Sequence, residues 1–226
     1  MPTVILVRHG RTTANADGTL AGRSPGVALD EHGQAQAKQL AERLAVLPYA
    51  QIVTSPLQRC VETAEALAAA RPGTPVTEDE RLTECGYGEW TGRTLRELAK
   101  ERLWRVVQAH PAAAAFPGEG GEALRDVQAR AVAAVREWDA RVAAEQGPKA
   151  LWVACTHGDV IKAIVADALG LHLDFFQRLT VDPAGVSVIT YTEMRPFLVR
   201  LNDTGSLDGL VPARRRGRRR GRGSDA

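Results

Sequence analysis

The sequence predicts an α/β protein, a three-layer α/β/α sandwich with a mostly parallel central sheet. Short runs of branched apolar residues, typical of strands buried on both faces, alternate with longer segments in which apolar residues recur at helical spacing. Two of these runs, residues 4–7 and 151–155, are each followed within two residues by a His-Gly pair. Because the carboxyl ends of parallel strands lie at one edge of a sheet, we expect both histidines at that edge.

Polar residues follow the first apolar run at once. Arg8 carries a planar cation that suits a phosphate or carboxylate, and His9 carries an imidazole that can act as a nucleophile or as an acid or base. Gly10 lets the backbone approach a ligand closely. Thr12 and Asn15 add neutral donors a few residues on. These residues predict an anion site that contains a histidine; the alternative is a strand end whose Arg and His are only solvated.

The next segments predict a helix and a second strand. Asp30 is expected to cap a helix over residues 31–47, which Pro48 ends. Residues 51–54 follow as a short strand.

Ser55 and Pro56 have the pattern of an N-cap followed by proline at the first helical position, so we expect a helix from there to about residue 70. Arg59 then lies in the first turn, beside the positive end of the helix dipole. A cation is disfavoured there unless an anion accompanies it. We therefore expect Arg59 to face a ligand; an ordinary surface arginine is the alternative.

A glycine-rich loop over residues 81–92 places two aromatic side chains around two carboxylates. Tyr87 and Trp90 are expected to wall a pocket. A carboxylate among apolar rings has a raised pKa. The two carboxylates of this loop are Glu84 and Glu89.

The remaining segments complete the alternation of strands and helices. The pattern predicts a strand at 75–77, a helix over 94–109, a mobile segment over 112–121, helices over 122–146 and 159–169, and strands at 185–191 and 197–201. We expect a helical insertion between about residues 94 and 146 to cover the mouth of the site.

The composition is ordinary for a soluble globular protein, with 44% hydrophobic and 25% charged residues in a chain of 226. No apolar run approaches the roughly 20 residues that span a bilayer, and the first is too short for a signal-peptide core. The three cysteines are widely spaced and form no CxxC pair, which argues against a disulfide framework or a zinc site. We therefore expect a cytoplasmic protein without membrane contact.

The net charge of +2 conceals a basic C-terminus, because residues 214–226 carry seven arginines and one aspartate. We expect residues 1–203 to form one domain and residues 204–226 to be a disordered tail rich in Arg and Gly. Nucleic acid or an acidic surface would contact the protein only through the arginines of 214–222. A solvated tail without a partner is the alternative.

Six segments in order resemble the histidine phosphatase superfamily, in its phosphoglycerate mutase-like branch. They are Arg8-His9-Gly10 with Thr12 and Asn15, residues 29–37, residues 55–64, residues 84–92, Gly120-Gly121-Glu122 followed by Arg130, and Thr156-His157-Gly158. Two positions depart from the family pattern: Arg11 replaces the common Glu, and Ala123 replaces the usual Ser. Both departures leave the substrate preference open.

The resemblance implies a role for each matching residue. His9 is the nucleophile that forms a phosphohistidine; Arg8, Arg59 and His157 bind the nonbridging oxygens. Glu84 protonates the leaving alkoxide, with Glu89 as the alternative. Further expected substrate contacts come from Asn15, Thr12 and Arg23. The nearby cations should keep His9 neutral. Neither a metal nor another cofactor is implied.

The function implied is a metal-independent phosphomonoester hydrolase that acts on a small phosphorylated metabolite. A phosphomutase is the alternative, disfavoured because this chain lacks the longer insertion that the family's mutases carry over the site. A binding module for a phosphorylated ligand, with a tail that docks nucleic acid, is the alternative from another class. The sequence is also compatible with a homodimer.

Two further arginines bear on the substrate. Arg11 and Arg23 are expected either to bind a second acidic group of the substrate or to pair with Asp17 or Asp30. The first case predicts a phosphorylated acid or sugar acid as substrate.

Overall fold

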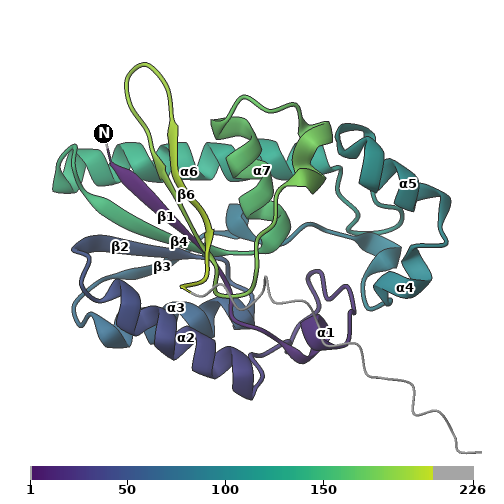
Figure 1. The fold of residues 1–226 in the computed structure, drawn as a ribbon, viewed down its shortest axis with the longest axis horizontal. Coiled ribbons are helices and arrows are strands. Elements are labelled where there is room, and N and C mark those ends of the chain that lie inside the picture. The colour runs from purple at the N-terminus through teal and green to yellow at the C-terminus, as the bar shows by residue number, and fades with distance from the viewer. Residues whose placement is uncertain (1, 206–226) are drawn as a thin grey trace, which may run out of the picture.

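The computed structural model describes residues 2–205, and Figure 1 draws the remaining residues in grey. The predicted tail contact through residues 214–222 therefore lies outside the described residues. Within residues 2–205, no helix combines the length and the apolar character needed to cross a membrane.

The structure is built around one six-stranded sheet with the strand order β3-β2-β4-β1-β5-β6. The strands are β1 (Thr3–Arg8), β2 (Tyr49–Thr54), β3 (Val76–Glu78), β4 (Leu151–Thr156), β5 (Val186–Thr190) and β6 (Phe197–Asp203). Strands β1 to β4 are parallel, whereas β5 and β6 pair antiparallel at one side. The predicted mostly parallel sheet is confirmed.

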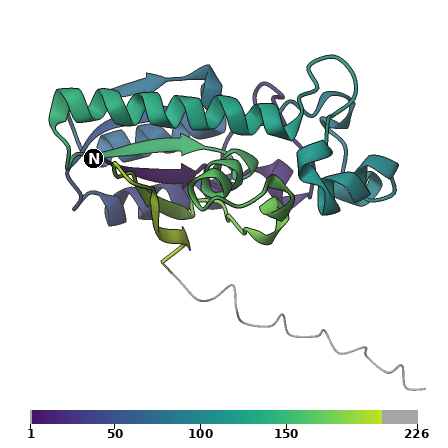
Figure 2. The same cartoon turned by 90° about the horizontal axis from the view of Figure 1, so that it is seen from above.

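Helices cover both faces of the sheet (Figures 1 and 2). Those on one face are α2 (Glu31–Leu44) and α3 (Gln58–Ala70), and those on the other are α6 (Leu124–Gln146) and α7 (Gly158–Ala168). Successive side chains of β1 alternate between the two layers, as a strand requires. Val4 and Leu6 join the apolar cluster of α6 and α7, while Ile5 and Val7 join that of α2 and α3. The predicted three-layer sandwich is confirmed.

The short helices lie together at one end of the molecule, on the right in Figure 1. They are α1 (Thr13–Ala16), α4 (Leu95–Leu98) and α5 (Arg102–Ala109). The segment 94–146 thus has two parts: α4 and α5 lie at this end, whereas α6 packs along the sheet as one of the sandwich layers.

The predicted single helix over 94–109 is wrong, because the structure breaks it between α4 and α5. Leu98 and Val107 are both buried in the same core. Nine residues apart on one continuous helix, they would point to opposite sides. The break lets both side chains face the core.

Two other expectations are corrected. Helix α3 begins at Gln58, not at Pro56, and the hydroxyl of Ser55 accepts a hydrogen bond from the amide of Leu57 just before the helix. The segment 112–121 is held by packing and by hydrogen bonds, since Phe116 is buried and its amide donates to the carbonyl of Glu122.

Candidate active site

The two His-Gly pairs meet at the carboxyl edge of the sheet. Strands β1 and β4 are neighbours, and Arg8 lies in register with Thr156. The residues that follow, His9 and His157, therefore stand side by side, with ring centroids 5.2 Å apart. Both rings are buried.

The ring of His9 has a defined hydrogen-bonding pattern. Its Nδ1 lies 2.7 Å from the carbonyl oxygen of Gly10, which only accepts, so Nδ1 carries the proton and Nε2 carries the lone pair. The Nε of Arg59 donates to this Nε2 at 3.3 Å. Burial, together with the charges of Arg59 and Arg8, holds the pKa of His9 well below its usual value. The imidazole is therefore neutral, and its lone pair lies on Nε2, where it accepts the hydrogen bond from Arg59.

Two glycines allow the His9 loop to pack closely against the start of α2. A Cβ atom on Gly33 would lie 1.9 Å from the carbonyl oxygen of Arg11, and one on Gly10 would lie 2.6 Å from the carbonyl oxygen of Gly33. The carboxylate of Asp30 accepts from the amide of Gly33 and caps the helix. The loop that carries His9 is thus fixed by contacts that a side chain at either glycine would break.

Arg8 and Arg59 both line the cavity that contains His9, and the charges of both act on its ring. Arg8 donates from Nη1 to the carbonyl of Val181 at 2.6 Å, and Arg59 donates from Nη2 to that of Gly22 at 2.7 Å. The Nε of Arg8 and the Nη1 of Arg59 are buried and have no partner within the described part of the chain. Buried donors without partners cost free energy, so this arrangement favours an anion between them.

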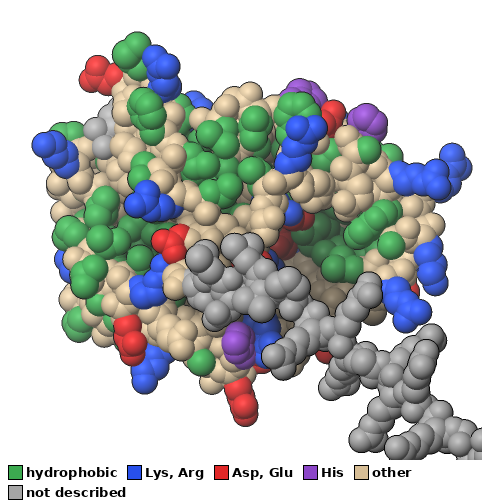
Figure 3. Space-filling model, viewed as in Figure 1, with side chains coloured by type: hydrophobic (Ala, Val, Ile, Leu, Met, Phe, Trp, Pro, Cys, Tyr) green, Lys and Arg blue, Asp and Glu red, His purple; other side chains and the backbone are tan. Residues whose placement is uncertain are grey.

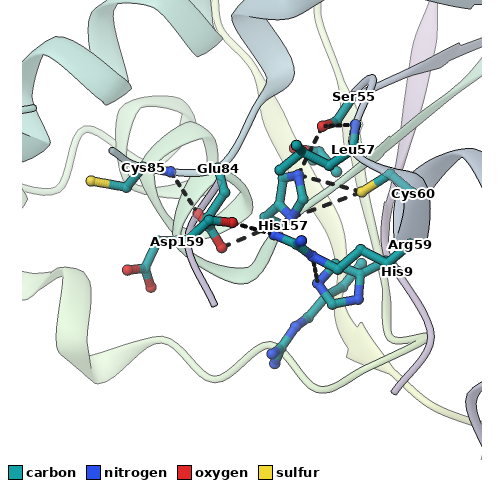
Figure 4. A network of polar contacts seen from close by, with 12 residues as sticks. His9, Ser55, Leu57, Arg59, Cys60, Glu84, Cys85, His157 and Asp159 are labelled. Atoms are coloured by element: carbon teal, nitrogen blue, oxygen red, sulfur yellow. Dashed lines mark hydrogen bonds and ion pairs between the residues drawn. The ribbon is translucent and has the colours of Figure 1, made fainter. Parts of the chain in front are cut away.

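His157 lies between His9 and the carboxyl group of Glu84 (Figure 4). Its Nε2 lies 2.8 Å from the hydroxyl of Ser55 and 3.4 Å from the sulfur of Cys60, and its Nδ1 lies 3.9 Å from Oε2 of Glu84. Burial and the charge of Arg59 lower the pKa of His157. Ser55 and Cys60 are contacts that the sequence analysis did not identify.

Glu84 is a buried carboxyl that lines the same cavity as His9 and Arg59. Burial first, and then the charge of Asp159, raises its pKa to about 7. Asp159 itself accepts a hydrogen bond from the hydroxyl of Tyr87 at 2.7 Å. Glu89 is exposed and does not line the cavity, so the structure favours Glu84 over Glu89 as the acid.

Thr12 and Asn15 form a reciprocal capping box at the start of α1. The side-chain oxygen of Asn15 accepts from both the amide and the hydroxyl of Thr12. The NH₂ group of Asn15 is therefore the end of this side chain left to donate to a ligand. Both residues line the cavity, and their contact with substrate stays a prediction.

Arg11 and Arg23 occupy different surroundings. Arg11 lines the cavity, and its Nε pairs with Asp30 at 2.8 Å. Pairing with Asp30 is one of the two alternatives that the sequence left open, the other being contact with an acidic group of the substrate. Arg23 does not line the cavity. It donates from Nε to the carbonyl of Glu84 and from Nη2 to the carboxylate of Glu122. A substrate contact by Arg23 stays a prediction, but its present partners favour a role in placing Glu84.

The residues around the histidines line a cavity of about 620 Å³. Four of its other lining residues escaped the sequence analysis: Trp104, Phe116, Asp159 and Lys162. A signal existed for two of them, because Asp159 and Lys162 are three residues apart in the helix that follows His157-Gly158 and so share one side of it. No group of three or more His, Cys, Asp or Glu within residues 2–205 has the arrangement of a metal site.

The fold and the site combine two buried guanidinium groups with a neutral histidine at the carboxyl edge of a parallel sheet. The sequence model of the histidine phosphatase superfamily (branch 1) matches residues 4–204, so the chain belongs to this superfamily. The family resemblance inferred from the motifs is confirmed.

Similar proteins include both phosphatases and mutases. A glucosyl-3-phosphoglycerate phosphatase of Mycolicibacterium vanbaalenii is 35% identical over 183 residues, 76% of each chain. A probable phosphoglycerate mutase of Klebsiella pneumoniae is 33% identical over 201 residues, 88% of each chain. The solved structure of a mycobacterial glucosyl-3-phosphoglycerate phosphatase in complex with VO3 has a TM-score of 0.77 at 29% identity, covering 88% of this chain and 98% of that one.

Proposed function

We propose that the chain is a metal-independent phosphomonoesterase that acts through a phosphohistidine at His9 on a small phosphorylated metabolite. One observation carries the proposal: buried, unpartnered nitrogens of Arg8 and Arg59 lie in the site where Nε2 of His9 presents its lone pair. A phosphoryl group there would meet a nucleophile and cationic donors for its charge. The related structure in complex with VO3, an oxyanion of similar chemistry, supports the same assignment.

In the first step, Nε2 of His9 attacks phosphorus and the ester P–O bond breaks. Arg8 and Arg59 stabilise the nonbridging oxygens, and His157 adds a donor from the adjacent strand end. The departing alkoxide takes the proton of Glu84, whose pKa, raised to about 7, leaves a large share of the carboxyl groups protonated at neutral pH.

In the second step, water attacks the phosphohistidine. The ionised Glu84 accepts a proton from this water as the P–N bond breaks, which releases phosphate and restores neutral His9. After the second step Glu84 is protonated again and the electron pair of the P–N bond is back on Nε2 of His9. The cycle therefore needs no reactant besides the ester and water. The same Glu84 carboxyl thus serves both steps.

A phosphomutase is the second candidate, because one related protein is named as a probable phosphoglycerate mutase. A mutase would transfer the phosphoryl group from His9 to a second hydroxyl instead of to water. We also propose a cytoplasmic location, where the free thiols of Cys60, Cys85 and Cys155 would stay reduced.

The test is phosphate release from a panel of phosphomonoesters in the presence of a chelator, with the wild-type chain beside His9→Ala. We expect the wild type to release phosphate and the variant to release none. After brief reaction with a ³²P-labelled ester and a rapid quench, the wild-type protein should also carry an acid-labile ³²P label. Conversion of 3- to 2-phosphoglycerate without phosphate release would assign the mutase instead. Binding of the esters without turnover would assign the binding module.

A further inference from the structure

The cavity extends well beyond the phosphoryl site, and its outer part has two unlike walls. This inference rests on the proposed function and concerns the alcohol that leaves. One wall comes from α4, α5 and the segments beside them, and the other comes from α7 and the 3₁₀ helix Leu173–Arg178. In Figure 3, hydrophobic side chains in green gather at the hollow in the right half of the view.

The first wall is apolar and aromatic. Trp104 stacks on Trp90, with ring centroids 6.3 Å apart and an angle of 29° between the rings. Phe116 and Trp90 pack edge to face, with ring centroids 5.3 Å apart. Leu95 lines the cavity mouth with 43% of its surface exposed. A large apolar side chain held open beside an aromatic stack favours a ligand with an apolar face.

The second wall is polar. Lys162 donates to the side-chain oxygen of Gln177 at 3.4 Å, and Gln177 donates in turn to the carbonyl of Val107. These amide and ammonium groups can hydrogen-bond hydroxyl or ether oxygens at the edge of a ring that packs on the opposite wall.

The charges of the outer cavity are already matched. Arg11 pairs with Asp30 at 2.8 Å, and Lys162 lies 3.9 Å from Asp159. Among the described lining residues, Arg8 and Arg59 are the guanidinium and ammonium groups without a carboxylate partner, and both belong to the phosphoryl site. A carboxylate on the leaving group would therefore meet cations whose charge Asp30 and Asp159 already balance.

We propose that the natural substrate is the phosphomonoester of an uncharged, ring-bearing alcohol. Its ring lies against Trp104 and Leu95, and its polar rim faces Lys162 and Gln177. A carbohydrate ring and an aryl ring share the required apolar face, so both fall within this class. A short, acidic alcohol such as phosphoglycerate falls outside it.

The test uses the full chain and two matched pairs of phosphates that have similar alkoxide leaving groups. Benzyl phosphate against ethyl phosphate measures the ring, and glycerol 3-phosphate against 3-phosphoglycerate measures the carboxylate. We expect kcat/KM to be about tenfold or more higher for benzyl than for ethyl phosphate, the factor that burying one ring face supplies. We also expect glycerol 3-phosphate to exceed 3-phosphoglycerate.

Methyl glucoside 6-phosphate then distinguishes a carbohydrate ring from the aryl ring of benzyl phosphate. If Lys162 contacts the polar rim of the carbohydrate, Lys162→Met should lower kcat/KM for this ester more than for benzyl phosphate. Trp104→Ala should reduce the benzyl-to-ethyl ratio severalfold. Phe175→Ala is the control, because Phe175 is an exposed aromatic residue outside the cavity. It should leave the ratio intact.

Equal rates for benzyl and ethyl phosphate, or 3-phosphoglycerate as the fastest ester, would overturn the inference while leaving the phosphatase intact. An unchanged benzyl-to-ethyl ratio in Trp104→Ala would overturn the contact between the substrate ring and the aromatic wall. Failure of every ester to release phosphate would instead be a failure of the proposed function.

Discussion

The Nε of Arg23 donates a hydrogen bond to the backbone carbonyl oxygen of Glu84 at 2.8 Å. Arg130 donates to the same oxygen at 3.2 Å, and both guanidinium groups pair with Glu122, whose carboxylate accepts from the amide of Gly86. The backbone of Glu84 is thus clamped by residues far apart in the sequence. The clamp fixes where the acid stands relative to the phosphoryl site.

Arg23→Met should therefore lower kcat about tenfold with a small change in KM, because a misplaced acid slows the chemistry more than it weakens binding. Arg23→Lys, which keeps a donor, should recover part of the loss. Arg43→Met is the control, since Arg43 forms an exposed ion pair with Asp203. A selective rise in KM for acidic phosphoesters would instead indicate that Arg23 binds a second acidic group of the substrate, which is one of the two roles that the sequence predicts for it.

Activity on alkyl phosphates should decline as the pH rises through about 7, where Glu84 loses the proton it must donate. The lowered pKa of His9 keeps the nucleophile neutral down to values below 6.5, so the acidic side of the profile should stay flat over that range. The measurement is kcat/KM against pH. Glu84→Gln should abolish the alkaline decline along with most of the activity, and a decline that persists in this variant would assign the titration to another group.

The stability of the fold should also depend on pH through the carboxyl of Glu84. The pKa of Glu84 rises from 4.5 to about 7 on folding, so the unfolded chain ionises first and stability falls as the pH increases between these values. Glu84→Gln removes this penalty. We expect the variant to match the wild type near pH 4.5 and to exceed it by up to about 3 kcal/mol above pH 7, measured by urea unfolding.

If the stability difference between Glu84→Gln and wild type is the same at both pH values, Glu84 has an ordinary pKa in the fold. The buried acid would then have to be assigned elsewhere.

Ala123→Ser should stabilise the protein by about 1 kcal/mol. Ala123 is the N-cap of α6 with extended backbone angles and no side-chain cap, and serine would offer a hydroxyl to the first turn. Ala140→Ser, at an exposed position within the same helix, is the matched control and should be neutral or slightly destabilising. Thermal unfolding distinguishes the two variants. Equal shifts in Tm would show that the hydroxyl at position 123 does not cap α6.

Much of the fold was readable from local patterns. The alternation of buried strands and amphipathic helices predicted the sandwich, and the two apolar runs ending in His-Gly predicted that His9 and His157 would meet. Helix ends were less predictable. The break between α4 and α5 depends on Leu98 and Val107 sharing one core, which no local pattern records.

The residue types of the site were fixed by the sequence, because an imidazole, two guanidinium groups and a carboxyl can be identified one by one along the chain. Which nitrogen of His9 carries the lone pair, which carboxylates neutralise Arg11 and Arg23, and why Glu84 holds its proton were decided only by the tertiary structure. The physical reason is that protonation and pairing depend on distance and on the exclusion of water. Both are set by segments that lie tens of residues apart in the chain and meet only in the folded protein.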